Sequence, residues 1–280
     1  MEHNIKLFTD SAADLPRHIQ EAYDVDIVPL SVIFGEQEYK DGVTISPEEF
    51  YRKLASDPEL PSTNQVNPHE FVQAFRPYLD AGKDILYIGL SHRLSGTFQS
   101  AVLAKEMLDS KRVHLFNSLS ASLGEALCVL KAGELAAAGL SIPEIVFELE
   151  KHRRNAFGFF MLDALDHVVR GGRLSKTQGL VGSILQIKPL LHFTPEGTIE
   201  VRERVRTAKK ALQSMIDKAL TEQTDFSNAT LAAAHTNAGS VFQEFVAMVK
   251  EQLKPKRLIE GLVGSTVGTH AGPGGIGLFY

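Results

Sequence analysis

The sequence predicts an α/β protein of two domains, with a parallel sheet in residues 1–155 and a mixed sheet in residues 156–280. Short apolar runs alternate with helix-like segments in the first part, which is typical of parallel strands joined by helices. In the second part a glycine turn joins two strand-like runs, which indicates an antiparallel pair. The 280 residues, 44% of them hydrophobic, can bury the cores that this architecture needs.

Four runs in the first domain have the length and composition of buried strands: residues 5–8, 27–34, 85–90 and 113–116. The starts of two helices between them are marked by a capping side chain followed by proline, at Ser46-Pro47 and Asn67-Pro68. A longer helix is expected over residues 120–138, where Gly139 can form a left-handed cap. Another helix is expected from Pro143 to about residue 153.

Five runs in the second domain are strand-like: residues 157–162, 188–193, 198–206, 230–235 and 258–263. Helices are expected over residues 208–222 and 240–253. The turn Pro195-Glu196-Gly197 joins two of the strands as a hairpin, so this sheet is predicted to be mixed. The change of pattern near residue 155 marks the predicted domain boundary.

Composition narrows the function classes. A net charge of -5 disfavours broad binding to nucleic acids, which relies on many contacts from Lys and Arg to phosphates. No apolar run reaches the length of a membrane span, and the polar residues 1–4 lead into a strand rather than into a signal sequence. Cys128 lies among apolar neighbours and is expected to be a buried residue in a reducing compartment. The sequence therefore predicts a cytoplasmic protein, and its scattered histidines predict no metal site.

The run at residues 85–90 is followed by Ser95-Gly96-Thr97, at the start of a helical segment. This is the edge of a parallel sheet where ligands bind, and the unpaired amides of a helix start favour an anion. Gly96 lets a ligand approach the backbone, while Ser95 and Thr97 add hydroxyl donors. A simple helix cap explains these residues at least as well.

Two further candidates are weak by themselves. Thr63 lies in a polar loop between Pro61 and Asn67, where the alternative is a surface turn. His270 lies in the glycine-rich residues 264–274, and a lone histidine is usually structural.

Two basic segments suggest a docking surface. Arg170-Gly171-Gly172-Arg173 forms a basic turn, and Arg202, Arg204 and Arg206 share one face of a predicted strand. The alternatives are a solvated charged face and a site for an acidic or phosphorylated partner.

Six segments, taken in order, resemble the DegV family over nearly the whole chain: residues 9–16, 61–68, 94–101, 171–175, 187–191 and 268–274. The resemblance implies two α/β domains that enclose a long-chain fatty acid such as palmitate. It places Thr63 and Ser95 at the fatty-acid carboxylate, with Gly96 and Thr97 in the same turn and His270 close by. It also implies no cofactor and no enzymatic activity of the chain's own.

The family includes carriers that present a bound fatty acid to a separate ATP-dependent fatty acid kinase, which makes an acyl phosphate for phospholipid synthesis. The resemblance places Arg173 and Arg206 near the surface that docks this kinase, and Arg170 belongs to the same basic turn as Arg173. The sequence departs from the usual pattern of the family at Asn64, Val66, Asn67 and Asn117, and in having His92-Arg93 before the Ser-Gly-Thr turn.

Two other functions are open on the residues alone. An enzyme acting on a small phosphorylated or carboxylated metabolite would use Ser95-Gly96-Thr97 as an anion site and His270 as general acid or base. The sequence has no Walker A motif, no His-Glu-x-x-His and no Gly-x-Ser-x-Gly elbow. A regulatory protein would use Arg173 and Arg206 as an interaction surface, with lipid as a structural filler.

Overall fold

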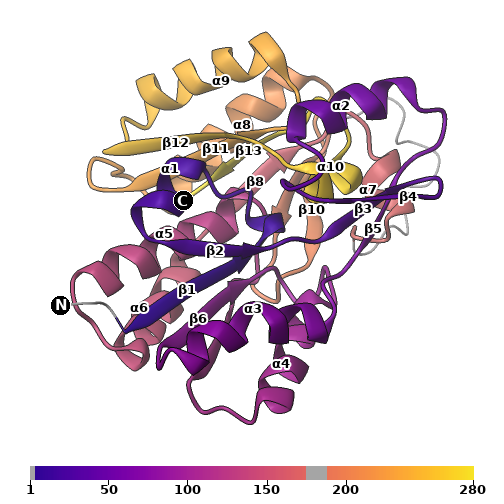
Figure 1. Ribbon diagram of the computed structural model, residues 1–280. Coiled ribbons are helices and arrows are strands. Elements are labelled where there is room, and N and C mark those ends of the chain that lie inside the picture. The colour runs from indigo at the N-terminus through magenta and orange to yellow at the C-terminus, as the bar shows by residue number, and fades with distance from the viewer. Residues whose placement is uncertain (1–3, 175–187) are drawn as a thin grey trace.

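The computed structural model describes residues 4–174 and 188–280, and two large sheets form its framework (Figure 1). The first sheet is parallel and has four strands in the order β2 (Val25–Val28), β1 (Ile5–Asp10), β6 (Asp84–Gly89) and β7 (Val113–Asn117). The parallel sheet predicted for the first part of the chain is confirmed. Two residues of the family-like segments, Ser175 and Ile187, lie outside the described residues.

The second sheet has six strands in the order β10 (Ile199–Glu203), β9 (Leu190–Phe193), β8 (Gly158–Met161), β13 (Ile276–Phe279), β11 (Thr230–His235) and β12 (Arg257–Leu262). Only the β11–β12 pair is parallel among these neighbours, so the mixed sheet is confirmed. The predicted hairpin joins β9 and β10, and Gly197 adopts a φ of +81° in its turn. The strand predicted over residues 198–206 is shorter than expected, because the pairing becomes irregular near its end.

The strand predicted over residues 27–34 is wrong, because the chain leaves the first sheet at Pro29. Proline has no N–H to donate to a strand ladder. After it, β3 (Ser31–Phe34) joins a separate antiparallel sheet between β4 (Gln37–Lys40) and β5 (Ser62–Asn64). Thr63 pairs with Val32 in this small sheet, so the surface turn considered for Thr63 is also wrong.

Helices cover both faces of the parallel sheet. On one face lie α3 (Pro68–Asp80) and α4 (Thr97–Leu108), and on the other lie α5 (Leu123–Ala137) and α6 (Ile142–Asn155). The capping side chains predicted at Ser46, which starts α2 (Pro47–Ser56), and at Asn67, which starts α3, are confirmed, and in each helix the glutamate at the third position completes a capping box. Gly139 follows α5 with a φ of +87°, as the predicted cap requires.

The helix α5 is shared by the two sheets. One side of it packs with β1 and β6, and the other side packs with β11, β12 and β13. Cys128 is buried on the first of these sides, as predicted, and burial raises the pKa of its thiol to about 12. Because both halves of the chain pack on α5, the domain boundary near residue 155 stays a prediction.

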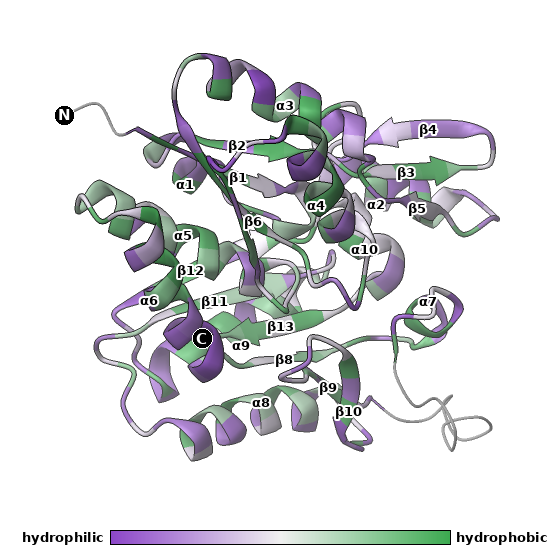
Figure 2. Cartoon of the chain, turned by 90° about the horizontal axis from the view of Figure 1, so that it is seen from below, coloured by the Kyte–Doolittle hydropathy of each residue, from purple (hydrophilic) through white to green (hydrophobic). Residues whose placement is uncertain are grey.

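The outer face of the mixed sheet is covered by α8 (Ala208–Glu222) and α9 (Gly239–Gln252). Figure 2 shows α8 alternating between hydrophilic and hydrophobic colours, as expected of a helix with one face on a core. Four short helices complete the described structure: η1 (Ser11–Ala13), α1 (Arg17–Ala22), α7 (Asp166–Arg170) and α10 (Ser265–Ala271). No helix in residues 4–174 or 188–280 combines the length and the apolar character that a membrane span requires.

Candidate functional site

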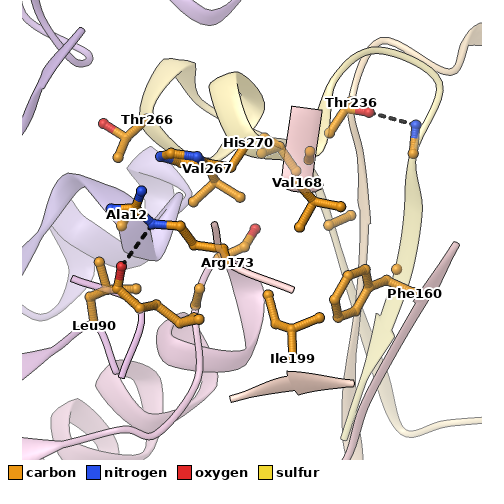
Figure 3. A pocket seen from close by; sticks show the side chains of 18 of the residues that line it. Ala12, Leu90, Phe160, Val168, Arg173, Ile199, Thr236, Thr266, Val267 and His270 are labelled. Atoms are coloured by element: carbon orange, nitrogen blue, oxygen red, sulfur yellow. Dashed lines mark hydrogen bonds between the residues drawn. The ribbon is translucent and has the colours of Figure 1, made fainter. Parts of the chain in front are cut away.

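A cavity of about 280 Å³ lies between the mixed sheet, the carboxyl edge of the parallel sheet and α10 (Figure 3). This is about twenty times the roughly 10–15 Å³ that a single water molecule needs. Apolar side chains form most of its wall: Leu90, Leu94, Phe160, Val168, Ile199 and Phe279. Polar groups of Thr63, Ser95, His270 and Arg173 also line it. The cavity therefore suits an amphipathic molecule rather than a small, fully polar metabolite.

Thr63 and His270 are brought together from distant parts of the chain. Thr63 lies in β5 and His270 in the last turn of α10, and the Thr63 Oγ1 atom is 2.9 Å from the His270 Nε2 atom. The hydroxyl and the imidazole form one polar group in the cavity wall.

Two acidic side chains, the buried Asp41 and the partly buried Asp14, hold the start of α10. Asp41 accepts hydrogen bonds from Ser265 N at 3.0 Å, Ser265 Oγ at 2.6 Å and Thr266 N at 3.1 Å. Asp14 accepts from Gly264 N at 2.7 Å and also from the Ser122 hydroxyl. The oxygen atoms of these acidic side chains satisfy free N–H groups at the helix N-terminus, so they fix the direction in which α10 carries His270 to the cavity.

His270 is neutral at pH 7. Burial, together with the smaller electrostatic effects of Arg173 and His167, lowers the pKa of its imidazole to about 4. A methyl group at Gly171 would lie 2.3 Å from the Nδ1 atom of His270, so only glycine fits there. Within the described part of the chain, no carboxylate hydrogen-bonds to His270.

The three residues of the Ser95-Gly96-Thr97 turn lie in different surroundings. Ser95 and Gly96 line the cavity, whereas Thr97 is fully buried and does not line it. Thr97 Oγ1 lies 3.0 Å from Ser95 Oγ and accepts from Val66 N at 3.3 Å. Ser95 Oγ also accepts from Thr97 N at 3.2 Å, but the N-cap residue of α4 is Gly96, so Ser95 satisfies one N–H of the helix start without being its N-cap. Thr97 thus links the turn to the segment that carries Thr63.

The three arginines of the predicted docking surface lie in different surroundings. Arg173 is half-buried in the cavity wall, where its Nε donates to Leu94 O at 3.1 Å and its guanidinium donates to Gly171 O. Burial lowers the pKa of this guanidinium. Arg170 ends α7 and Arg206 follows β10, and both side chains are exposed.

The departures from the family pattern have local explanations. Asn67 caps α3 and Val66 is fully buried in the core. Asn64 pairs with Ser31 and lines the cavity. Asn117 forms a turn, in which its Oδ1 accepts from Leu119 N at 3.0 Å and its Nδ2 lies 2.6 Å from a ring nitrogen of His92.

Sequence reasoning missed several residues of the site. Gln65, Thr266 and the phenylalanines of the mixed sheet also line the cavity; Gln65 and Thr266 lie in segments that the sequence marked, but neither was predicted as a site residue. The described residues contain no group of three His, Cys, Asp or Glu side chains that could hold a metal ion.

Comparison with known proteins places these features in a family. The family described as "Uncharacterised protein, DegV family" matches residues 4–280. A DegV domain-containing protein of Caldanaerobacter subterraneus is 37% identical over 276 residues, which cover 99% of this chain and 98% of the relative.

Two solved structures share the fold. A DegV family protein from Thermus thermophilus, described for its fatty acid binding, is 30% identical with a TM-score of 0.91 and 98% coverage of both chains. A stearic acid-binding protein from Eubacterium ventriosum is 27% identical with a TM-score of 0.89, and the match covers 98% of this chain and 97% of the other. On the family match, the sequence identity and the shared fold, this chain belongs to the DegV family.

Proposed function

We propose that this protein binds a long-chain fatty acid such as palmitate, with its carboxylate at Thr63 and Ser95. The observation that carries the proposal is an apolar cavity whose wall brings together neutral hydroxyls and a neutral imidazole. The relatives from Thermus thermophilus and Eubacterium ventriosum, described as binding fatty acid and stearic acid, support the same class of ligand.

The acyl chain supplies most of the affinity. About fifteen methylenes at roughly 0.8 kcal/mol each give on the order of 12 kcal/mol of transfer free energy, before the costs of association. Each hydrogen bond to the carboxylate contributes about 1.5 to 3 kcal/mol. The head-group contacts therefore decide the orientation of the ligand, while the tail decides how tightly it binds.

The polar groups suit a carboxylate that must later react. Thr63, Ser95 and neutral His270 can hydrogen-bond to it without forming an ion pair. Arg173 adds a positive charge to the same cavity, but two backbone carbonyls already accept hydrogen bonds from its guanidinium. The carboxylate is thus held by directional but moderate interactions.

The protein acts as a carrier and not as an enzyme in its own right. It presents the carboxylate to a separate fatty acid kinase, which forms the acyl phosphate. The exposed Arg170 and Arg206 contribute to docking of this kinase, and Arg173 connects the docking side with the cavity.

Lipid extraction and binding assays test the ligand. Purified protein is expected to contain C14 to C18 fatty acid detectable by mass spectrometry, and delipidated protein is expected to bind added palmitate. Protein that contains no fatty acid and fails to bind palmitate would overturn the proposal.

Affinity capture tests the docking role. Arg170→Glu combined with Arg206→Glu is expected to abolish capture of the kinase, whereas Arg76→Glu is the matched control, because Arg76 is also exposed but lies on α3. Equal capture by both variants would exclude these two arginines from the interface.

A further inference from the structure

A second cavity, of about 490 Å³, lies behind the first. Its wall is formed by α5, by the segment after β7 and by strands β8, β9 and β13. Two side chains, Phe193 of β9 and Phe279 of β13, line both cavities. The two spaces therefore meet at these two rings.

The two rings form a thin partition. Their centroids are 6.3 Å apart, and their planes are inclined by 39°. A methyl group at Gly158 would come within 2.9 Å of both rings, and one at Gly124 within 2.9 Å of Phe279. Both glycines line the second cavity, so the backbone there packs directly against the rings. Phe160 packs on Phe193, with ring centroids 5.3 Å apart. Phe160 lines the first cavity but not the second.

The rings differ in how firmly they are held. Phe279 is 4% exposed and lies in a strand that is paired on both sides, with β8 and β11. Phe193 is half-buried and is the last residue of β9, directly before the turn to β10. Displacing Phe193 disturbs less packing than displacing Phe279 does.

The second cavity can receive hydrocarbon. Leu119, Leu127, Phe157 and Phe159 contribute apolar surface to its wall. Charged and polar side chains also form part of the wall: Arg153, Arg154, His192, Arg202 and Glu222. Arg153 donates to Asn117 O at 2.7 Å and pairs with Glu150, and Arg202 pairs with Glu222 at 4.0 Å. An acyl chain that passes the partition would therefore lie along the apolar part of this wall.

We infer that Phe193, backed by Phe279, sets the length of acyl chain that this protein accepts. This inference rests on the proposed function. The two rings form the end of the fatty-acid cavity and so limit the length of the acyl chain that fits in it. Removal of the Phe193 ring joins the two cavities, so that longer chains bind.

A series of saturated fatty acids from C12 to C22 tests the inference by isothermal titration calorimetry. In the wild-type protein, affinity is expected to rise about fourfold for each added methylene until the tail reaches the rings, and then to stop rising. In Phe193→Ala the rise is expected to continue to longer acids. Phe193→Leu provides a smaller opening, with a smaller extension, in case the alanine variant does not fold.

Phe157→Ala is the matched control, because Phe157 is also half-buried but lines only the second of the two cavities. In this variant, affinity is expected to stop rising at the same chain length as in the wild type. The inference would be overturned if affinity stopped rising at the wild-type chain length in both Phe193 variants. It would also be overturned if Phe157→Ala shifted this chain length as much as the Phe193 variants do. A wild-type protein that binds no acid in the series would instead overturn the proposed function.

Discussion

Replacing Thr63 by valine removes one hydroxyl from the proposed head-group site and keeps the shape of the side chain. The Thr63 Oγ1 atom lies 2.9 Å from His270 Nε2 and lines the cavity. A hydrogen bond to a charged group contributes about 1.5 to 3 kcal/mol, so Thr63→Val is expected to weaken palmitate binding roughly ten- to hundredfold. The variant also leaves His270 without this partner, which lowers the stability of the free protein by about 1 kcal/mol.

Isothermal titration of delipidated protein with palmitate at pH 7 measures this effect. Thr63→Ser, which keeps the hydroxyl, is expected to recover most of the affinity. Ser62→Ala serves as the matched control, because Ser62 is the exposed neighbour of Thr63 in β5 and does not line the cavity. Equal affinities of the wild type, Thr63→Val and Ser62→Ala would show that the carboxylate does not bind at Thr63.

Three further predictions concern the support of the site and the core. Asp41→Ala removes the acceptor of three hydrogen bonds at the start of α10. It is expected to lower the free energy of unfolding, measured with urea, by about 2 kcal/mol or more, and to weaken palmitate binding. An unchanged stability and affinity would show that Asp41 does not support α10. Burial raises the pKa of Asp14 to about 8, so its contribution to stability is present below pH 4 and is lost as the pH rises through 8. The melting temperature of Asp14→Asn should therefore rise relative to the wild type between pH 5 and pH 9, and a constant difference would count against the shift. Cys128 should react with a thiol reagent only after unfolding, whereas rapid labelling of the native protein would contradict its burial.

Local sequence patterns predicted the parts of the fold that local physics determines. The strands β1, β6 and β7 are rich in apolar residues, with Lys6 in β1 and His114 in β7 between them, and the capping side chains before proline at Ser46 and Asn67 mark two helices. The break at Pro29 was visible in the sequence, but the transfer of β3 to another sheet depends on pairing with β5, about thirty residues away. The strand β13 was not predicted, because the glycines before and within it obscure its apolar pattern.

The site was less accessible to sequence reasoning. Thr63 and His270 meet across 207 residues of chain, and no periodicity connects them. Asp41 fixes the helix that carries His270, from a position that no motif marked. The resemblance to the DegV family named Thr63, Ser95 and His270, whereas the cavity wall depends on how two sheets and α10 pack together.

A crystal structure of the protein with bound palmitate would locate both ends of the ligand. The carboxylate oxygens are expected about 2.5–3.0 Å from Thr63 Oγ1 and Ser95 Oγ, and the acyl chain is expected along the apolar wall toward Phe193 and Phe279. A palmitate with its carboxylate against Phe193 and Phe279, or one bound outside this cavity, would contradict the proposed binding mode.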